Sequence, residues 1–186
     1  MVPVTSLWMP ILVSAVIVFL ASFLTHMVLT YHRSDWRKIP KQDDVMAALR
    51  PFNIPPGDYM MPCGEGPASM KDPAFIERMK AGPVALLTVM PTGMRGMGGN
   101  LAQWFVFCIV VSIFAAYLTG RALGVGADYR EVFRFAGTVA FVGYALAEIP
   151  NSIWYQRAWS TTMKNLMDGL IYGLLTGGTF GWLWPR

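Results

Sequence analysis

The sequence has few charged residues and almost no cysteine, and both shortages limit the class of protein it can be. Only 14% of the 186 residues are charged and only 2 are cysteines, whereas 54% are hydrophobic. Two cysteines exclude a disulfide framework, and the low charge excludes an ordinary soluble domain. No block of like charge predicts a disordered tail, and a net charge of +4 is too modest for a nucleic-acid-binding surface. The composition therefore predicts an integral membrane protein that binds no nucleic acid.

Four apolar runs are long enough to cross a bilayer, which takes about 20 residues of helix for roughly 30 Å of hydrocarbon. No basic segment precedes the first run and no cleavage site follows it, which predicts an uncleaved anchor and not a signal peptide. The predicted spans are residues 7–29, 101–118, 132–149 and 163–184. The expected fold class is an all-α membrane protein, with four transmembrane helices in a bundle and a small mixed extramembrane loop domain at residues 32–100.

Basic residues near the span ends predict the orientation, because Lys and Arg are retained on the cytoplasmic side during insertion. They are more frequent on the side of the long loop. On that side lie Arg33, Arg37, Lys38, Lys41, Arg50, Arg95, Arg157 and Lys164, and on the opposite side lie Arg121, Arg130, Arg134 and Arg186. We therefore expect the loop in the cytoplasm and both termini outside. The unpaired thiol of Cys63 in the loop also suits a reducing compartment.

Small residues recur at every fourth position in two of the spans. The predicted helix-packing residues are Gly169, Gly173, Gly177 and Gly181 in the last span, and Cys108, Ser112, Ala116 and Gly120 in the second. Such stripes let helices approach closely in lipid, where van der Waals contact drives their association. They either close a compact bundle within one chain or face a second copy or another membrane protein, and both arrangements disfavour a wide water-filled pore.

The long loop has the signals of a folded domain. The run KQDDVMAALRPF predicts a short helix, and Asp72 as N-cap, Pro73 at the first turn and Gly82 after the end bracket a second helix, PAFIERMKA. Residues 83–90, PVALLTVM, are too few to span and predict either a buried strand or a segment at the membrane interface. The stretches NIPPGDYMMPCGEGP and PTGMRGMGGN predict turn-rich connections.

Sulfur-containing side chains in the loop raise the question of metal binding, because thioethers and thiolates favour Cu(I). The candidate ligands are Met60, Met61, Cys63, Met90, Met94 and Met97, with His32 as a further candidate. No CxxC and no regular methionine array accompanies them, and methionine also serves as adaptable apolar filler. A membrane enzyme centred on Cys63 is the last alternative, because no neighbouring base supports this thiol as a nucleophile.

Three ionisable residues lie inside the predicted spans: His26, Glu148 and Asp168. Charges inside a membrane are costly and are functional candidates by default. All three lie toward the loop side, about 9 to 12 Å from the middle of their spans at about 1.5 Å per residue. They either line a polar pocket that holds a proton or a cation, or they have only local partners, Lys164 for Asp168 and Arg157 for Glu148.

No sequence motif indicates a reaction, so we do not expect an enzyme. The chain contains no P-loop, GxGxxG, GxSxG or HExxH motif, and no inverted repeat typical of a secondary transporter. Three segments do carry a family resemblance: PVALLTVMPTG, LAQWFVFC and DGLIYGLLTGGTFGWLWP. Through them, residues 31–186 resemble an uncharacterised family of small bacterial inner-membrane proteins. The resemblance implies a location in the bacterial inner membrane and no activity.

Two functions follow as hypotheses. The first is a structural or accessory membrane protein that lies in the lipid bilayer and packs through its small-residue faces. Its partner would be another membrane protein or a second copy of itself, within a larger membrane complex. The second is a small ion-, proton- or metal-handling membrane protein built on His26, Glu148 and Asp168. The sequence assigns no cofactor to either.

Overall fold

The computed structural model describes residues 1–94 and 96–186 and is mostly helical. The chain divides into two units. Unit 1 comprises Met1–Arg37 and Gly96–Arg186, and unit 2 comprises Lys38–Arg95. The sequence predicts that the extramembrane domain begins at residue 32, but residues 32–37 belong to unit 1, where the side chains of His32 and Asp35 bond to its last long helix.

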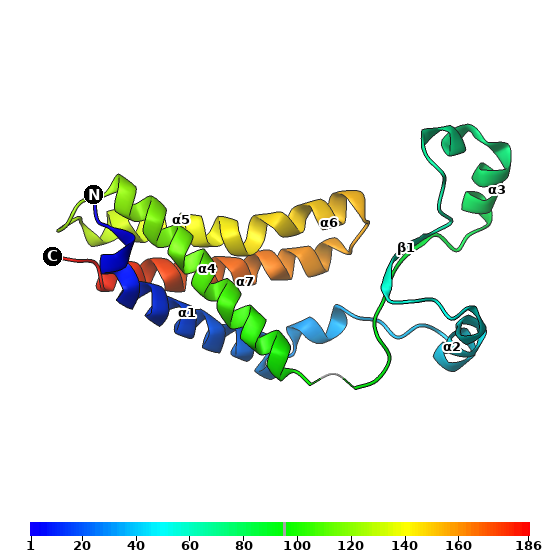
Figure 1. The fold of residues 1–186 in the computed structure, drawn as a ribbon, viewed down its shortest axis with the longest axis horizontal. Helices are drawn as coiled ribbons and strands as arrows, with labels where there is room; N and C mark the ends of the chain where they lie inside the picture. Colours follow the sequence, from blue (N-terminus) through cyan, green and yellow to red (C-terminus); the bar gives the residue numbers. More distant parts are fainter. Residues whose placement is uncertain (95) are drawn as a thin grey trace. The chain divides into compact units, whose positions relative to one another are not determined.

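Unit 1 consists of helices that pack side by side (Figure 1). They are α1 (Trp8–Phe23), α4 (Gly98–Ala122), α5 (Tyr129–Ala145), α6 (Ile149–Trp154) and α7 (Trp159–Trp182). Within the described residues, three stretches are long and apolar enough to cross a membrane: Val4–Val28, Gly98–Ala122 and Tyr129–Trp154. The prediction of membrane-spanning helices is confirmed at this level. The third stretch runs beyond the predicted end at residue 149, because Pro150 lies in the first turn of the new helix α6, where a proline is tolerated.

Helix α7 corresponds to the fourth predicted span, but it is less apolar than the other three. Its glycines, threonines and Asp168 dilute the hydrophobic run, and the helix lies against α1 and α5. Its place in unit 1 therefore follows from packing on its neighbours, and its passage through the membrane stays a prediction.

The glycine stripe of α7 lies against α5 of the same chain. A Cβ added at Gly173 would stand 2.9 Å from the carbonyl oxygen of Gly137, and one at Gly177 would stand 2.6 Å from that of Phe133. Gly169 meets Ala145 and Gly181 meets Tyr129 in the same way. The stripe thus brings two helix backbones into contact within one chain and does not leave this face open for a second copy.

The small residues of α4 face α1 and the N-terminal segment. Ser112 shares a hydrogen bond of 3.0 Å with Ser14, and Cys108 is buried in the cluster that contains Ala15 and Val18. Ala116 is buried in a second cluster with Leu7 and Ile11. At the end of the stripe, the carbonyl oxygen of Gly120 accepts a hydrogen bond of 2.7 Å from the Val2 backbone amide. The two termini lie at this end of unit 1 (Figure 1).

Unit 2 has mixed structure. It contains α2 (Gln42–Leu49), β1 (Gly57–Met61), α3 (Pro73–Ala81) and β2 (Ala85–Val89), and the two strands pair antiparallel. Helix α3 has the predicted bounds, and the Asp72 side chain accepts a hydrogen bond of 3.0 Å from the Ala74 amide. Strand β2 lies within residues 83–90, as the strand alternative predicts, but it is not the buried strand expected there, because its residues are half-buried or exposed. Strand β1 lies where only turns were predicted, because prolines and glycines flank a short strand signal.

Candidate functional site

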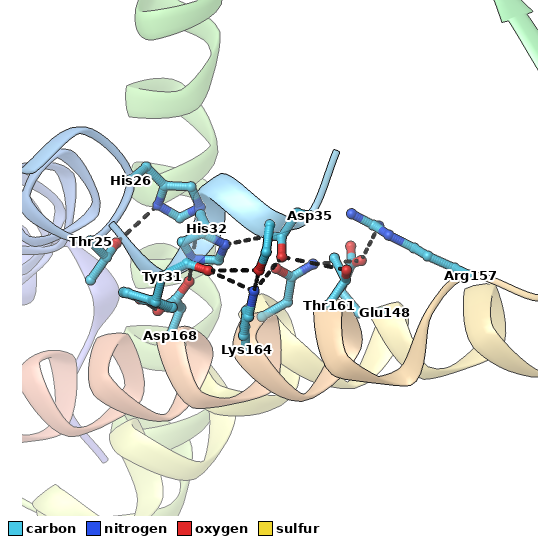
Figure 2. Close-up of polar contacts among 12 residues, drawn as sticks. Thr25, His26, Tyr31, His32, Asp35, Glu148, Arg157, Thr161, Lys164 and Asp168 are labelled. Carbon is cyan, nitrogen blue, oxygen red and sulfur yellow. Dashed lines mark hydrogen bonds and ion pairs between the residues drawn. The ribbon is translucent and has the colours of Figure 1, made fainter. Parts of the chain in front are cut away.

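Three side chains with metal-ligating atoms meet between the segment that follows α1 and helix α7 (Figure 2). His26 lies on the π-helical turn Leu24–Val28 that ends α1, His32 lies on the 3-10 turn Tyr31–Ser34, and Asp168 lies on α7. One ligating atom from each residue lies within 4.8 Å of the other two. Asp168 Oδ2 lies 2.7 Å from His32 Nε2 and 3.9 Å from His26 Nε2.

Lys164 fixes the turn that carries His32. Its ammonium group donates hydrogen bonds to the Tyr31 carbonyl oxygen at 2.6 Å and to Ser34 Oγ at 2.8 Å. It also pairs with Asp35 Oδ1 at 2.7 Å. These contacts tie the turn to α7 one helical turn before Asp168, and they bring His32 and Asp168 together.

The carboxylate of Asp35 holds the far side of the His32 ring. Asp35 Oδ2 lies 2.6 Å from His32 Nδ1. Burial alone would raise the pKa of Asp35, but hydrogen bonds from Lys164 and His32 and their positive charge outweigh it and lower the pKa. Asp35 is therefore a stable carboxylate that fixes both the position and the orientation of the imidazole.

Asp168 is almost fully buried, with 2% of its surface exposed. Its Oδ1 accepts a hydrogen bond from the phenol of Tyr31, so Oδ2 is the oxygen that faces the two histidines. Burial and the neighbouring Asp168 carboxylate raise the pKa of Tyr31 and keep its phenol protonated as a donor.

His26 completes the cluster from the end of α1. Its Nδ1 lies 2.9 Å from Thr25 Oγ1 and 3.2 Å from the Ser22 carbonyl oxygen, which leaves Nε2 to face Asp168. The ring stacks on that of His32, with centroids 4.3 Å apart and an angle of 11° between planes. Both histidines of the sequence therefore lie in one site.

The charges at this site leave room for a cation. Lys164 balances Asp35, and Asp168 remains as a second carboxylate beside two imidazoles. His32 has a carboxylate oxygen within 2.7 Å of each ring nitrogen, yet a neutral imidazole carries only one N–H. In a neutral ring, one of the two nitrogens therefore presents a lone pair and can act as a metal ligand.

The structure brings together two of the three predicted pocket residues. His26 and Asp168 share the site, but Glu148 does not belong to it, because its carboxylate pairs with Arg157 at 3.0 Å. Of the two predicted alternatives for Glu148, the structure shows the second, a local ion pair with Arg157. The expected pair of Lys164 with Asp168 is wrong, because Lys164 reaches Asp35 instead.

The sequence alone does not identify Asp35, and it indicates His32 only as a further candidate beside the sulfur ligands of the loop. The available signal was their spacing of three residues directly after the first span, which puts both side chains on one face of a helical turn. The loop candidates lie elsewhere. Met60 and Met61 are on β1 and Cys63 follows it with an exposed thiol, all in unit 2.

Comparisons with known proteins found no match: no protein family, curated protein or solved structure matches this chain. The resemblance to an uncharacterised family of bacterial inner-membrane proteins therefore stays a prediction, and the function is argued from the site itself.

Proposed function

We propose that this integral membrane protein binds a divalent transition-metal cation such as Zn²⁺ through His26, His32 and Asp168. The observation that carries the proposal is the convergence of one ligating atom each from His26, His32 and Asp168 within 4.8 Å of one another. Two imidazoles and one carboxylate are a set of ligands typical of catalytic zinc sites, which keep a fourth position open.

The hydrogen bonds that each ligand side chain makes to its neighbours support the proposal. Metal-bound histidines commonly donate their other N–H to a carboxylate or a backbone carbonyl, and ligating carboxylates are hydrogen-bonded in turn. Here His32 has Asp35, His26 has the Ser22 carbonyl oxygen, and Asp168 has the Tyr31 phenol. Each ligand is thus held so that its remaining atom faces the same point.

The distances suit a small ion with nitrogen and oxygen ligands. Zn²⁺ binds both at about 2.0 to 2.2 Å, so tetrahedral ligand atoms stand about 3.3 to 3.6 Å apart. The observed separations of 2.7 and 3.9 Å from Asp168 Oδ2 lie on either side of this value, so side-chain shifts below 1 Å would suffice. Ca²⁺ and Mg²⁺ prefer all-oxygen sites and fit less well.

The proposal includes the position of the metal site relative to the membrane. His26 lies in the last turn of the apolar stretch Val4–Val28 and His32 shortly after it, so we place the site near one face of the membrane. The basic residues of the sequence favour the cytoplasmic face of a bacterial inner membrane, with four spans in a bundle and both termini outside.

Metal analysis of the detergent-purified protein tests the proposal. We expect about one Zn²⁺ per chain after loading and dialysis, and loss of the ion in His32→Ala and Asp168→Asn. Glu148→Gln is the matched control, because it removes a nearby carboxylate that lies outside the site. Retention of zinc in both site variants, or its absence from the wild type, would overturn the proposal.

A second candidate function, an accessory subunit of a membrane complex, is supported by unit 2. Among its described residues only Phe75 is buried, although the unit contains many apolar side chains. Met60 and Leu86 face each other across the strand pair and are both about half exposed. A protein partner would cover them. Native electrophoresis of membrane extracts tests this: co-migrating polypeptides that Met60→Ser with Leu86→Ser removes support it, and a chain that migrates alone refutes it.

A further inference from the structure

An apolar groove lies directly beside the cluster, between the end of α1 and the start of α4. Its volume of about 560 Å³ is within the range of pockets that bind small molecules. Its walls include Leu20, Phe23 and Met27 from the first helical segment and Leu101 and Trp104 from α4. His26 lines the groove as well and is therefore common to the groove and the proposed metal site.

The proposed metal site is open on the side of His26. The exposed fraction of the side chain is 49% for His26, but only 11% for His32 and 4% for Asp168. A fourth ligand of the metal therefore approaches past His26, and this is the side chain that borders the groove. A molecule that lies in the groove and reaches the metal must have an apolar body.

Among the described residues that line the groove, no polar group other than that of His26 is left for such a molecule. Ser22 also lines it, but Ser22 Oγ already accepts a hydrogen bond of 2.8 Å from the Trp104 indole. The polar part of the ligand must therefore lie at the end of the groove that His26 lines. An apolar chain with a single polar head group fits this distribution.

The net charge of the metal and its three protein ligands determines which head group fits. A divalent cation bound by two neutral imidazoles and Asp168 retains one positive charge, since Lys164 already balances Asp35. An anionic oxygen ligand neutralises that charge in an apolar surrounding. We infer that the groove binds a long-chain carboxylate, with its chain between α1 and α4 and its head group at the open position of the metal beside His26. The inference rests on the proposed metal site.

Cobalt-loaded protein tests the inference, because the visible spectrum of Co²⁺ reports its ligands. Palmitate added to the Co²⁺ protein in detergent should change the visible band and saturate at about one equivalent, whereas acetate and hexadecanol at the same concentration should not. Leu101→Trp fills the groove and should weaken the palmitate response about tenfold or more without loss of Co²⁺. Leu118→Trp, at the other end of α4, is the matched control and should respond like the wild type.

The outcomes separate the two claims. A Co²⁺ spectrum that palmitate leaves unchanged, or equal responses of the two tryptophan variants, overturns the groove inference while the metal site stands. Failure to bind Co²⁺ at all overturns the metal site, and with it the inference that depends on it.

Discussion

Lys164 pairs with Asp35 across 2.7 Å, although its spacing of four residues on α7 would place it beside Asp168. Because Lys164 pairs with Asp35, Asp168 Oδ2 faces only the two histidines, and the turn that carries His32 is tied to α7. Lys164 touches no ligating atom of the proposed site and acts through the turn as a positioning residue.

Lys164→Met should therefore weaken metal binding without removing a ligand. Loss of contacts around metal ligands typically costs 10- to 100-fold in affinity. We expect a decrease of about this size in Zn²⁺ affinity, measured by competition with a chromophoric chelator. Lys164→Arg, which keeps the charge, should recover part of it. An unchanged affinity in Lys164→Met would show that the turn is held by other contacts.

Asp35 should make stability depend on pH. Its folded-state pKa is lowered, so its contribution to stability is fully present above the unfolded pKa of about 3.9 and is lost as pH falls through the folded value. In metal-free protein, Asp35→Asn should lower Tm at neutral pH, and the difference from wild type should shrink below about pH 4. A difference that stays constant from pH 7 to pH 3 would contradict this role.

Metal binding should weaken as the pH falls, because protons compete with the cation for the imidazole nitrogens and the carboxylate. Zn²⁺ affinity of the wild type, followed by isothermal titration between pH 8 and pH 5, should decrease at each step. Proton release on binding should accompany it. A pH-independent affinity would indicate a site without histidine.

The contact of α5 with α7 predicts opposite effects for two neighbouring glycines. A Cβ at Gly177 would stand 2.6 Å from the Phe133 carbonyl oxygen, whereas one at Gly178 meets only Tyr129 Oη at an ordinary 3.7 Å. Gly177→Ala should lower the free energy of unfolding by about 1 to 3 kcal/mol. Gly178→Ala should be neutral or gain up to about 1 kcal/mol from helix propensity. Thermal unfolding in detergent measures both, and equal effects would contradict the packing.

Local signals predicted much of this fold. The apolar runs predicted the long helices, and Asp72, Pro73 and Gly82 predicted α3 with its bounds. Glycine spacing identified the face of α7 that packs, but it could not identify Gly137 as its counterpart, because the partner of a stripe depends on tertiary geometry.

The site was only partly predictable for the same reason. His26 and Asp168 were visible as ionisable residues inside apolar runs. His32 and Asp35 lie outside those runs. His32 contacts Asp168 and Asp35 contacts Lys164, and both contacts join positions more than a hundred residues apart in the chain. Glu148, like Asp168, is an ionisable residue in a predicted span. The turn after α6 places Arg157 beside Glu148, and the two form an ion pair away from the cluster.

X-ray absorption at the zinc edge of the loaded protein tests the central claim most directly. The proposed site predicts a shell of nitrogen and oxygen ligands at about 2.0 to 2.2 Å with the outer-shell signature of two imidazoles. A sulfur shell at about 2.3 Å would contradict it and would place the metal on Cys63 or the methionines of unit 2.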